Sequence, residues 1–247
     1  MKRLIMIMLC ANAMLASSIK VAVAANVSYA IEDLKESFYL LYPDIKVDVI
    51  LGSTGKLTAQ VMHGAPYQIF MAANMFYPEK LYAEGFALTK PRVYAQGALA
   101  YISRERRDFR QGMKSLLSEN IEKIAIANPK TAPYGIAAKE ALQKAGVYEK
   151  LKPKFVYGES ISQTLTYAMK VTDIGIVAKS SLFSPRLLKF KNSEHFSDVN
   201  ITLYTPIKQG AVILKEGKES ADVKAFYSFL YSKKAQDIFQ KFGYILP

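Results

Sequence analysis

Residues 19–25, with the sequence IKVAVAA, form a short apolar run that leads directly into residues 26–28, NVS. The run predicts a buried strand, and the apolar positions that follow at helical spacing predict a helix after it. A second strand, predicted over residues 46–51, leads in the same way into residues 52–56, GSTGK. The first N–H groups of a helix lack partners within it, so both junctions direct donors and short polar side chains at one place. Such a place is suited to bind an anion.

The rest of the chain alternates short apolar runs with amphipathic stretches, which is the pattern of an α/β protein. Further strands are predicted over residues 69–72, 99–102, 124–127, 155–156 and 174–177. Helices are predicted from Pro78, over residues 134–145 and 163–171, and, as the last helix, from Ala221. The sequence has no repeats and no Gly/Ser linker. Two lobes would therefore be joined by strands, and the crossings are predicted near residues 93–98 and 204–210.

The composition is that of a globular protein with a basic surface. The chain has 247 residues, of which 51% are hydrophobic and 22% charged, and its net charge is +12. This length allows one or two ordinary hydrophobic cores. The basic residues are scattered among acidic ones, as in residues 104–108 (RERRD) and 215–219 (KEGKE). Because no motif combines aromatic and basic residues as single-strand binding requires, we expect no nucleic-acid partner.

The N-terminus has the features of a signal peptide over residues 1–18. Lys2 and Arg3 precede an apolar run over residues 4–10, and residues 11–13 (ANA) and 16–18 (ASS) have the small-x-small form of a cleavage site. Cleavage is expected near residue 13 or 18. The only cysteine, Cys10, lies within this segment, so the mature chain has no disulfide. These features predict an exported protein of the bacterial periplasm.

Residues for catalysis or cation binding are scarce. His63 and His195 are the only histidines, and the mature chain has no cysteine. No His, Asp or Glu cluster has the spacing of metal ligands, so we expect no cofactor and no bound metal cation. Residues 52–56 lack the upstream glycine of a P-loop. The sequence therefore predicts a protein that is not an enzyme.

Two more polar junctions follow predicted strands. Residues 128–135 (NPKTAPYG) come after the strand that ends at residue 127, and residues 158–162 (GESIS) come after the strand near residue 156. One such junction alone is usually an ordinary helix cap. Four of them, two in each expected lobe, indicate a ligand site, because ligands of α/β sheets bind outside the carboxyl ends of strands.

These motifs, in this order, resemble the periplasmic molybdate-binding proteins, the solute receptors of molybdate ABC importers. The matching segments are residues 24–26 (AAN), 52–57 (GSTGKL), 64–66 (GAP), 128–130 (NPK), 133–135 (PYG), 158–163 (GESISQ), 175–178 (GIVA) and 242–244 (FGY). The resemblance implies a type II periplasmic-binding-protein fold, in which two α/β lobes are joined by crossover strands around a ligand cleft. Lobe 1 would comprise residues 19–95 and 206–247, and lobe 2 residues 96–205.

The resemblance also implies the ligand and the residues that bind it. Molybdate, and with it tungstate, would lie in the interlobe cleft against five residues: Asn26, Ser53, Thr54, Tyr134 and Ile161. The first three would donate through side chains and nearby N–H groups, and the last two through backbone N–H groups. These residues would contact the oxygens of molybdate and would not ligate a metal cation. The implied partners are the membrane permease and the ATPase of the importer, and the protein is expected to be a monomer.

Three positions depart from the family pattern. Thr54 stands where serine is usual, Ala178 stands where some members have a tyrosine that contacts the oxyanion, and Asn74 stands where aspartate is usual. Thr54 retains the hydroxyl and adds a methyl group. The contact of the tyrosine is lost at Ala178, although alanine suits the branch of the family that carries asparagine at the position of Asn26.

Two other functions are compatible with the same residues. A receptor for sulfate, thiosulfate or phosphate would share the fold and the uncharged donors. A site that offers only hydrogen-bond donors favours a fully ionised oxyanion over protonated phosphate, because the proton on phosphate would find no acceptor there. Sulfate is fully ionised as well, so it must be distinguished by its size. An enzyme of the porphobilinogen deaminase type shares the two-lobed architecture. Such an enzyme requires a cysteine that carries its cofactor, and the mature chain is expected to have no cysteine.

Overall fold

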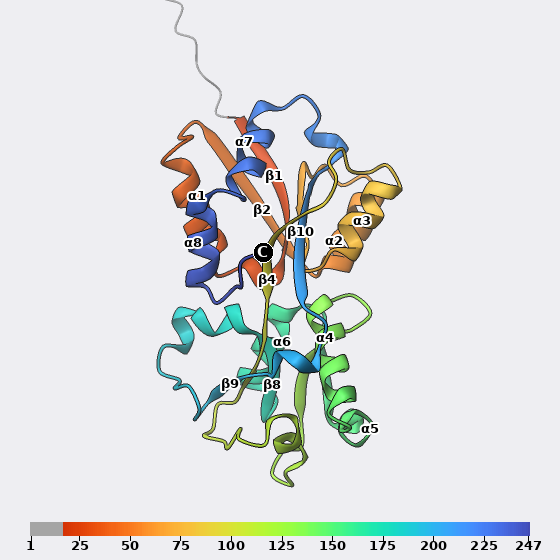
Figure 1. Cartoon of the computed structure of the whole chain (residues 1–247), viewed down its shortest axis with the longest axis vertical. Coiled ribbons are helices and arrows are strands. Elements are labelled where there is room, and N and C mark those ends of the chain that lie inside the picture. The colour runs from red at the N-terminus through yellow and green to blue at the C-terminus, as the bar shows by residue number, and fades with distance from the viewer. Residues whose placement is uncertain (1–16) are drawn as a thin grey trace, which may run out of the picture.

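The computed structural model describes residues 17–247 and consists of two α/β lobes stacked along the long axis of the molecule (Figure 1). Each lobe is built on its own five-stranded sheet. The predicted signal peptide falls almost entirely on residues 1–16, which lie outside the described residues. Within residues 17–247, no helix is long and apolar enough to cross a membrane.

Lobe 1 contains the sheet with the strand order β2-β1-β3-β10-β4. Its strands are β1 (Ser17–Ala24), β2 (Ile45–Gly52), β3 (Ile69–Met71), β4 (Arg92–Gly97) and β10 (Ile207–Ile213). Strand β1 pairs in parallel with β2 and β3, whereas β10 is antiparallel to β3 and β4. The helices are α1 (Ile31–Tyr39), α2 (Thr54–Met62), α3 (Phe76–Ala83), α7 (Ala221–Phe229) and α8 (Lys233–Lys241).

Lobe 2 contains the sheet with the strand order β7-β6-β8-β5-β9. Its strands are β5 (Leu99–Ile102), β6 (Ile124–Ala127), β7 (Phe155–Gly158), β8 (Ile174–Ala178) and β9 (Phe196–Asp198). Strand β6 is parallel to β7 and β8, and β5 is antiparallel to β8 and β9. The helices are α4 (Pro133–Lys144), α5 (Tyr148–Leu151) and α6 (Ile161–Lys170).

Short 3-10 helices complete the two lobes. They are η1 (Ala25–Val27), η2 (Gly112–Leu117), η3 (Lys152–Lys154), η4 (Lys179–Phe183), η5 (Pro185–Leu187), η6 (Ile201–Leu203) and η7 (Lys215–Gly217). Of these, η1 and η4 lie at the boundary between the lobes, where the Ser180 Oγ of η4 donates to the Asn26 carbonyl of η1 at 2.9 Å. They therefore connect the end of β1 directly to lobe 2.

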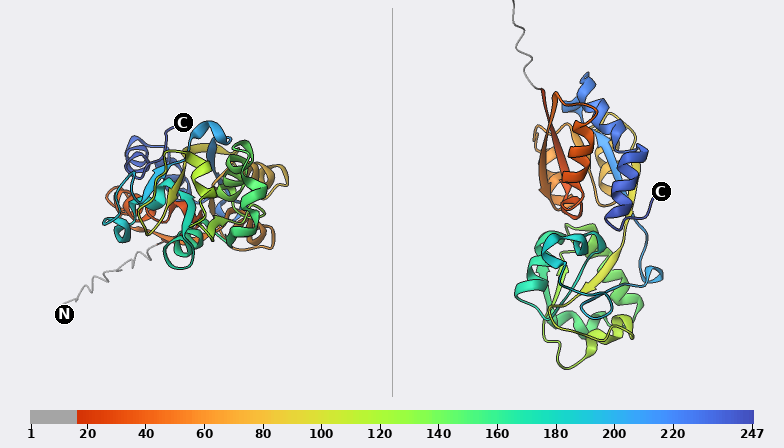
Figure 2. Two further views of the ribbon diagram at one scale, coloured as in Figure 1. Left: turned by 90° about the horizontal axis from the view of Figure 1, so that it is seen from below. Right: turned by 90° about the vertical axis from the view of Figure 1, so that its left-hand side faces the viewer.

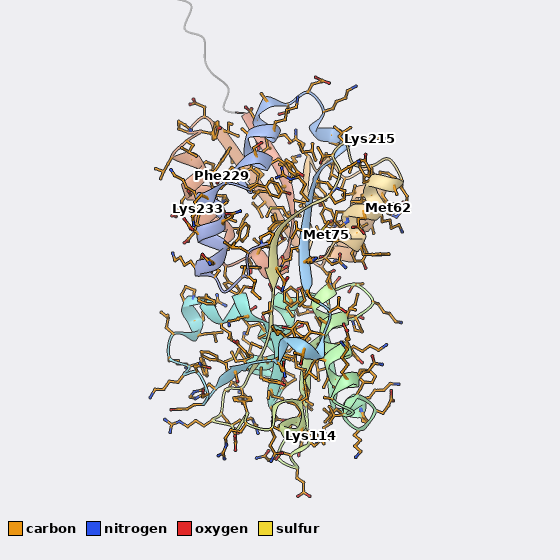
Figure 3. All side chains as sticks on the ribbon, viewed as in Figure 1. Met62, Met75, Lys114, Lys215, Phe229 and Lys233 are labelled. Atoms are coloured by element: carbon orange, nitrogen blue, oxygen red, sulfur yellow. The ribbon has the colours of Figure 1, made fainter. Side chains whose placement is uncertain are left out.

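The first sheet has a hydrophobic core on each face because side chains of a strand alternate between its faces. Val21 and Val23 pack with Phe38 and Phe226 on one face, and Ala22 packs with Leu57, Phe70 and Leu81 on the other. Lysine side chains such as Lys114, Lys215 and Lys233 are exposed and lie around the outside of both lobes (Figure 3). These basic side chains are thus spread over the surface of both lobes.

Two extended segments connect the lobes (Figure 2). The first passes from β4 to β5 through Ala98, and the second returns from β9 to β10 through residues 199–206. Tyr134 of lobe 2 packs closely on the first crossing. A Cβ atom at Gly97 would lie 2.0 Å from the Tyr134 hydroxyl, so only glycine fits at this position.

The structure confirms the α/β class and the predicted strands, most of them to within one or two residues. The prediction that the helix from Ala221 is the last one was wrong, because α8 follows it. Most residues of α8 are polar, and the two residues of this helix that are buried are Ala235 and Phe239. Helix α3 begins at Phe76 rather than at Pro78, and Asn26 lies in η1 rather than at the start of α1.

Candidate functional site

The carboxyl ends of two pairs of parallel strands face each other across the boundary between the lobes. In lobe 1, Ala24 at the end of β1 lies opposite Gly52 at the end of β2. In lobe 2, Ala127 at the end of β6 lies opposite Gly158 at the end of β7. The four polar junctions recognised in the sequence follow these four residues. Parallel pairing therefore brings junctions that are far apart in the chain to one place.

All five candidate residues line one small cavity at this place: Asn26, Ser53, Thr54, Tyr134 and Ile161. Its volume is about 10 Å³, roughly what a single buried water occupies, so the lobes must lie slightly further apart than in this structure when a larger ligand is bound. None of the described residues that line it carries a charged side chain. Among residues 17–247, no group of three or more His, Cys, Asp or Glu side chains is placed to hold a metal ion.

The lobes touch each other around this cavity. The Gly55 N–H donates to the Thr131 carbonyl at 2.9 Å, and the Ser162 hydroxyl donates to the Ala25 carbonyl at 3.0 Å. At the rim, the Lys56 ammonium lies 2.9 Å from the Glu159 carboxylate, and both side chains are more than half exposed. Exposed ion pairs contribute little, so the two partly buried hydrogen bonds contribute more to this closed arrangement than the ion pair does.

Three helices begin at the cavity. Thr54 and Ile161 are the first residues of α2 and α6, and Tyr134 is the second residue of α4. The N–H groups in a first helical turn have no partner within the helix, and the helix dipole makes this end positive. The converging helices therefore supply positive potential without a charged side chain, which is suited to an oxyanion.

The hydroxyl of Ser53 is buried and has no partner. Ser53 is the N-cap of α2, where a serine side chain commonly accepts a hydrogen bond from the first turn. Here it makes no such bond, and its Oγ finds no other partner among the described residues. The neighbouring Thr54 Oγ1 accepts from the Ala73 N–H at 3.1 Å, so its own proton is available for donation. Both hydroxyls can thus donate to an anion in the cavity.

Asn26 is almost fully buried and is held by both lobes. Its carbonyl accepts from the Ser180 hydroxyl at 2.9 Å and from the Tyr244 hydroxyl at 2.8 Å. Its side-chain Nδ2 donates to Gln209 Oε1 at 2.8 Å and to Tyr244 Oη at 2.9 Å, whereas Oδ1 has no partner. The amide group of Asn26 is therefore part of a buried network as well as of the cavity wall.

Sequence reasoning missed the residues behind the cavity. Gln209 on β10 contacts Asn26 on one side and donates to the Tyr134 hydroxyl on the other, at 3.1 Å. Nothing in the sequence around Gln209 marks it as special. Tyr244 lies in the C-terminal motif that carried part of the resemblance, and this motif was the available signal for it.

A larger groove lies outside this site. Its volume is about 500 Å³, and basic residues, among them Arg104, Lys170 and Arg186, line it together with Tyr29 of lobe 1. Neither converging N-termini of α-helices nor an unpartnered buried hydroxyl lines it among the described residues. We therefore assign the candidate site to the smaller cavity.

A family model described as bacterial extracellular solute-binding protein matches residues 19–245. The chain is a bacterial extracellular solute-binding protein. It is 38% identical over 201 residues to the molybdate-binding protein ModA of Rhodobacter capsulatus, an alignment that covers 81% of this chain and 77% of the relative. It is 36% identical over 232 residues to the molybdate-binding protein ModA of Azotobacter vinelandii, with 93% and 90% covered.

The fold of this solute-binding protein matches a solved structure closely. The periplasmic molybdate-binding protein of Azotobacter vinelandii superimposes with a TM-score of 0.85 and 33% sequence identity, over 93% of this chain and 99% of that one. The match confirms the predicted type II periplasmic-binding-protein fold. Family membership also confirms that the chain is a binding protein and not an enzyme.

Proposed function

We propose that this solute-binding protein captures molybdate, and also tungstate, in the cavity between its lobes and delivers the anion to an ABC importer. The observation that carries the proposal is the convergence of three helix N-termini and the unpartnered Ser53 hydroxyl on one uncharged cavity. The relatives from Rhodobacter capsulatus and Azotobacter vinelandii, both molybdate-binding proteins, support the choice of ligand.

The donor set favours a fully ionised tetrahedral anion. Backbone N–H groups and hydroxyls donate, and phosphate near neutral pH retains a proton that would face these donors. Sulfate has the same charge as molybdate and a smaller radius, so the size of the closed cavity must distinguish them. A receptor for sulfate, thiosulfate or phosphate is the alternative that the same chemistry allows.

Thermal unfolding in the presence of four anions tests the ligand. Molybdate and tungstate should each raise the melting temperature strongly, because a ligand that binds only the folded state adds about 2.7 kcal/mol of stability at 100 times its Kd. Sulfate and phosphate at the same concentrations should change it little, and chloride serves as the ionic-strength control. A shift with sulfate equal to that with molybdate would contradict selection by size.

We propose further that lobe 1 (residues 19–95 and 206–247) and lobe 2 (residues 96–205) move as units when the anion binds. Donors from both lobes surround the cavity, so neither lobe alone can contact all sides of a tetrahedral anion. The hydrogen bonds from Gly55 to Thr131 and from Ser162 to Ala25 join the lobes beside the cavity, so we expect the anion to enter before they form. Hinge closure of two domains around a ligand is a common transition of this kind.

Small-angle X-ray scattering should detect this closure. The radius of gyration is expected to be smaller at saturating molybdate than without it, because the ligand stabilises the form in which both sets of donors are engaged. Saturating chloride at equal ionic strength is the control. Identical scattering curves with and without molybdate would argue for a cleft that is already closed before binding.

The closed form is the species that we expect the importer to recognise. The permease and the ATPase are the proposed partners, and the ATPase would supply the energy for transport because this chain has no nucleotide-binding motif. We propose that the protein acts in the periplasm, where the relative from Azotobacter vinelandii is found. We also propose that it acts as a monomer.

A further inference from the structure

A buried hydrogen-bond network lies behind the cavity and links both lobes to the crossing strand β10. At its centre is Gln209, which is fully buried. Gln209 Oε1 accepts from Asn26 Nδ2 at 2.8 Å and from the Tyr94 hydroxyl at 2.9 Å. Gln209 Nε2 donates to the Tyr134 hydroxyl at 3.1 Å, and Tyr244 completes the network at Asn26. Of these five residues, only Asn26 and Tyr134 line the cavity.

The tyrosines of this network remain neutral. Burial raises the pKa of Tyr94, Tyr134 and Tyr244 well above the ordinary value of 10. Each hydroxyl therefore keeps its proton near neutral pH and can both donate and accept one bond. The network as a whole carries no charge. The orientations of the Asn26 and Gln209 side-chain amides therefore determine the direction of its hydrogen bonds.

The two amides can have either of two arrangements. In the arrangement described above, both Nδ2 hydrogens of Asn26 are engaged within the protein and Oδ1 is left without a partner. The oxygen and nitrogen of an amide occupy nearly the same space, so Asn26 and Gln209 can turn over together without moving any other residue. Gln209 Nε2 would then donate to Asn26 Oδ1 and to the Tyr94 hydroxyl, and Tyr94 retains the Ala72 carbonyl, at 3.2 Å, as its acceptor.

The second arrangement also gives every other group a partner. The Tyr134 hydroxyl, which accepts in the first arrangement, donates to Gln209 Oε1 in the second. The Tyr244 hydroxyl, which accepts from Nδ2 and donates to the Asn26 carbonyl in the first arrangement, turns its proton to Asn26 Oδ1 in the second, and the carbonyl keeps the Ser180 hydroxyl as its donor. The one group left over is then the Nδ2 of Asn26, a donor, in the position that Oδ1 occupied. A negatively charged ligand would stabilise this arrangement and disfavour the first, in which the oxygen of an amide would face it.

We propose that Gln209 is a positioning residue for anion binding, which holds Asn26 by its Oδ1 and so presents the Nδ2 hydrogens to the oxyanion. The inference rests on the proposed function of the cavity. In this proposal Gln209 does not touch the anion. It determines whether the donor Nδ2 or the acceptor Oδ1 of Asn26 faces the anion. A donor there favours an oxyanion without protons, whereas an acceptor would favour one that carries a proton.

The variant Gln209→Met tests this role because methionine has a similar length and makes no strong hydrogen bonds. Isothermal titration calorimetry at pH 7 with molybdate and with inorganic phosphate gives two affinities for each protein. In Gln209→Met the molybdate affinity should fall roughly tenfold, the usual effect of one hydrogen bond to a charged group. The ratio of molybdate to phosphate affinity should fall with it, because Asn26 is free to offer its oxygen to the protonated anion.

The matched control is Tyr227→Phe. Tyr227 is buried, and its hydroxyl donates to the Ala211 carbonyl of the same strand β10 at 3.3 Å, away from the cavity. This variant should keep both affinities. If Gln209→Met weakens the two anions equally, or changes neither affinity, Gln209 has only a structural role and the proposal is wrong. A wild-type protein that does not bind molybdate would instead refute the proposed function.

A measurement on the unmodified protein covers the case in which Gln209→Met does not fold. In the molybdate complex, the side-chain NH₂ protons of Gln209 should show nuclear Overhauser effects to the ring protons of Tyr94. Effects to the ring of Tyr134 instead would place the amide of Gln209 in the opposite orientation, and would overturn the proposal.

Discussion

Replacing Ser53 with alanine is expected to stabilise the ligand-free protein by about 1 kcal/mol and to weaken molybdate binding by roughly 1.5 to 3 kcal/mol. The Ser53 hydroxyl is buried and lacks a partner, so its removal relieves the cost of an unsatisfied polar group. In the complex, the same hydroxyl is proposed to donate to a charged oxygen, and that bond would be lost. The two effects have opposite signs, which a general disturbance of the fold would not produce.

Thermal unfolding without ligand and calorimetric titration with molybdate measure these two effects separately. The variant Ser181→Ala is the matched control because Ser181 Oγ is also buried without a partner but does not line the cavity. It should gain stability in the same way and bind molybdate as the wild type does. Unchanged molybdate affinity in Ser53→Ala would place the anion elsewhere.

Replacing Gly135 with alanine is expected to cost up to about 2 kcal/mol of folding stability and to impair anion binding. A Cβ atom at Gly135 would lie 2.2 Å from the Ala127 carbonyl oxygen and 2.9 Å from the Asn128 carbonyl carbon. Both are main-chain atoms that cannot move aside without distorting the end of β6. Overpacking of this kind typically costs 1 to 3 kcal/mol, and alanine regains only about 1 kcal/mol through its higher helix propensity.

The effect on binding follows from the position of Gly135 next to Tyr134. Relief of the clash must shift the start of α4, and with it the Tyr134 N–H that is proposed to donate to the anion. Chemical denaturation and molybdate titration of Gly135→Ala measure the two losses. The neighbouring change Ile136→Ala is the control, because Ile136 is 46% exposed and should affect neither quantity much. Wild-type affinity in Gly135→Ala would contradict the role of this helix start.

The strands and the four polar junctions could be predicted because their signals are local. The run over residues 19–25 and the segment over residues 52–56 each carry their own hydrophobic pattern and turn chemistry. The parallel pairing of β1 with β2 then follows from the α/β pattern. In the structure this pairing sets Asn26 beside Ser53, as the resemblance implied.

The network behind the cavity could not be predicted in the same way. Gln209 meets Asn26, which is 183 positions away in the chain, and no local pattern distinguishes it from an exposed glutamine on an edge strand. Helix α8 was overlooked although Ala235, Ile238 and Phe239 recur at helical spacing after the N-cap Ser232, so a local signal for it was present. The burial of Gln209, in contrast, depends on long-range packing, which the periodicity of one sequence does not report.

The absence of charged side chains from the described wall of the cavity has a consequence for how the receptor responds to its surroundings. A wall of N–H groups, hydroxyls and amides does not gain or lose protons near neutral pH, so acidification would not alter its charge. Capture would then depend on the ionisation of the anion alone. A solute-binding protein of this kind would keep a constant affinity for its anion while the acidity of its surroundings varies.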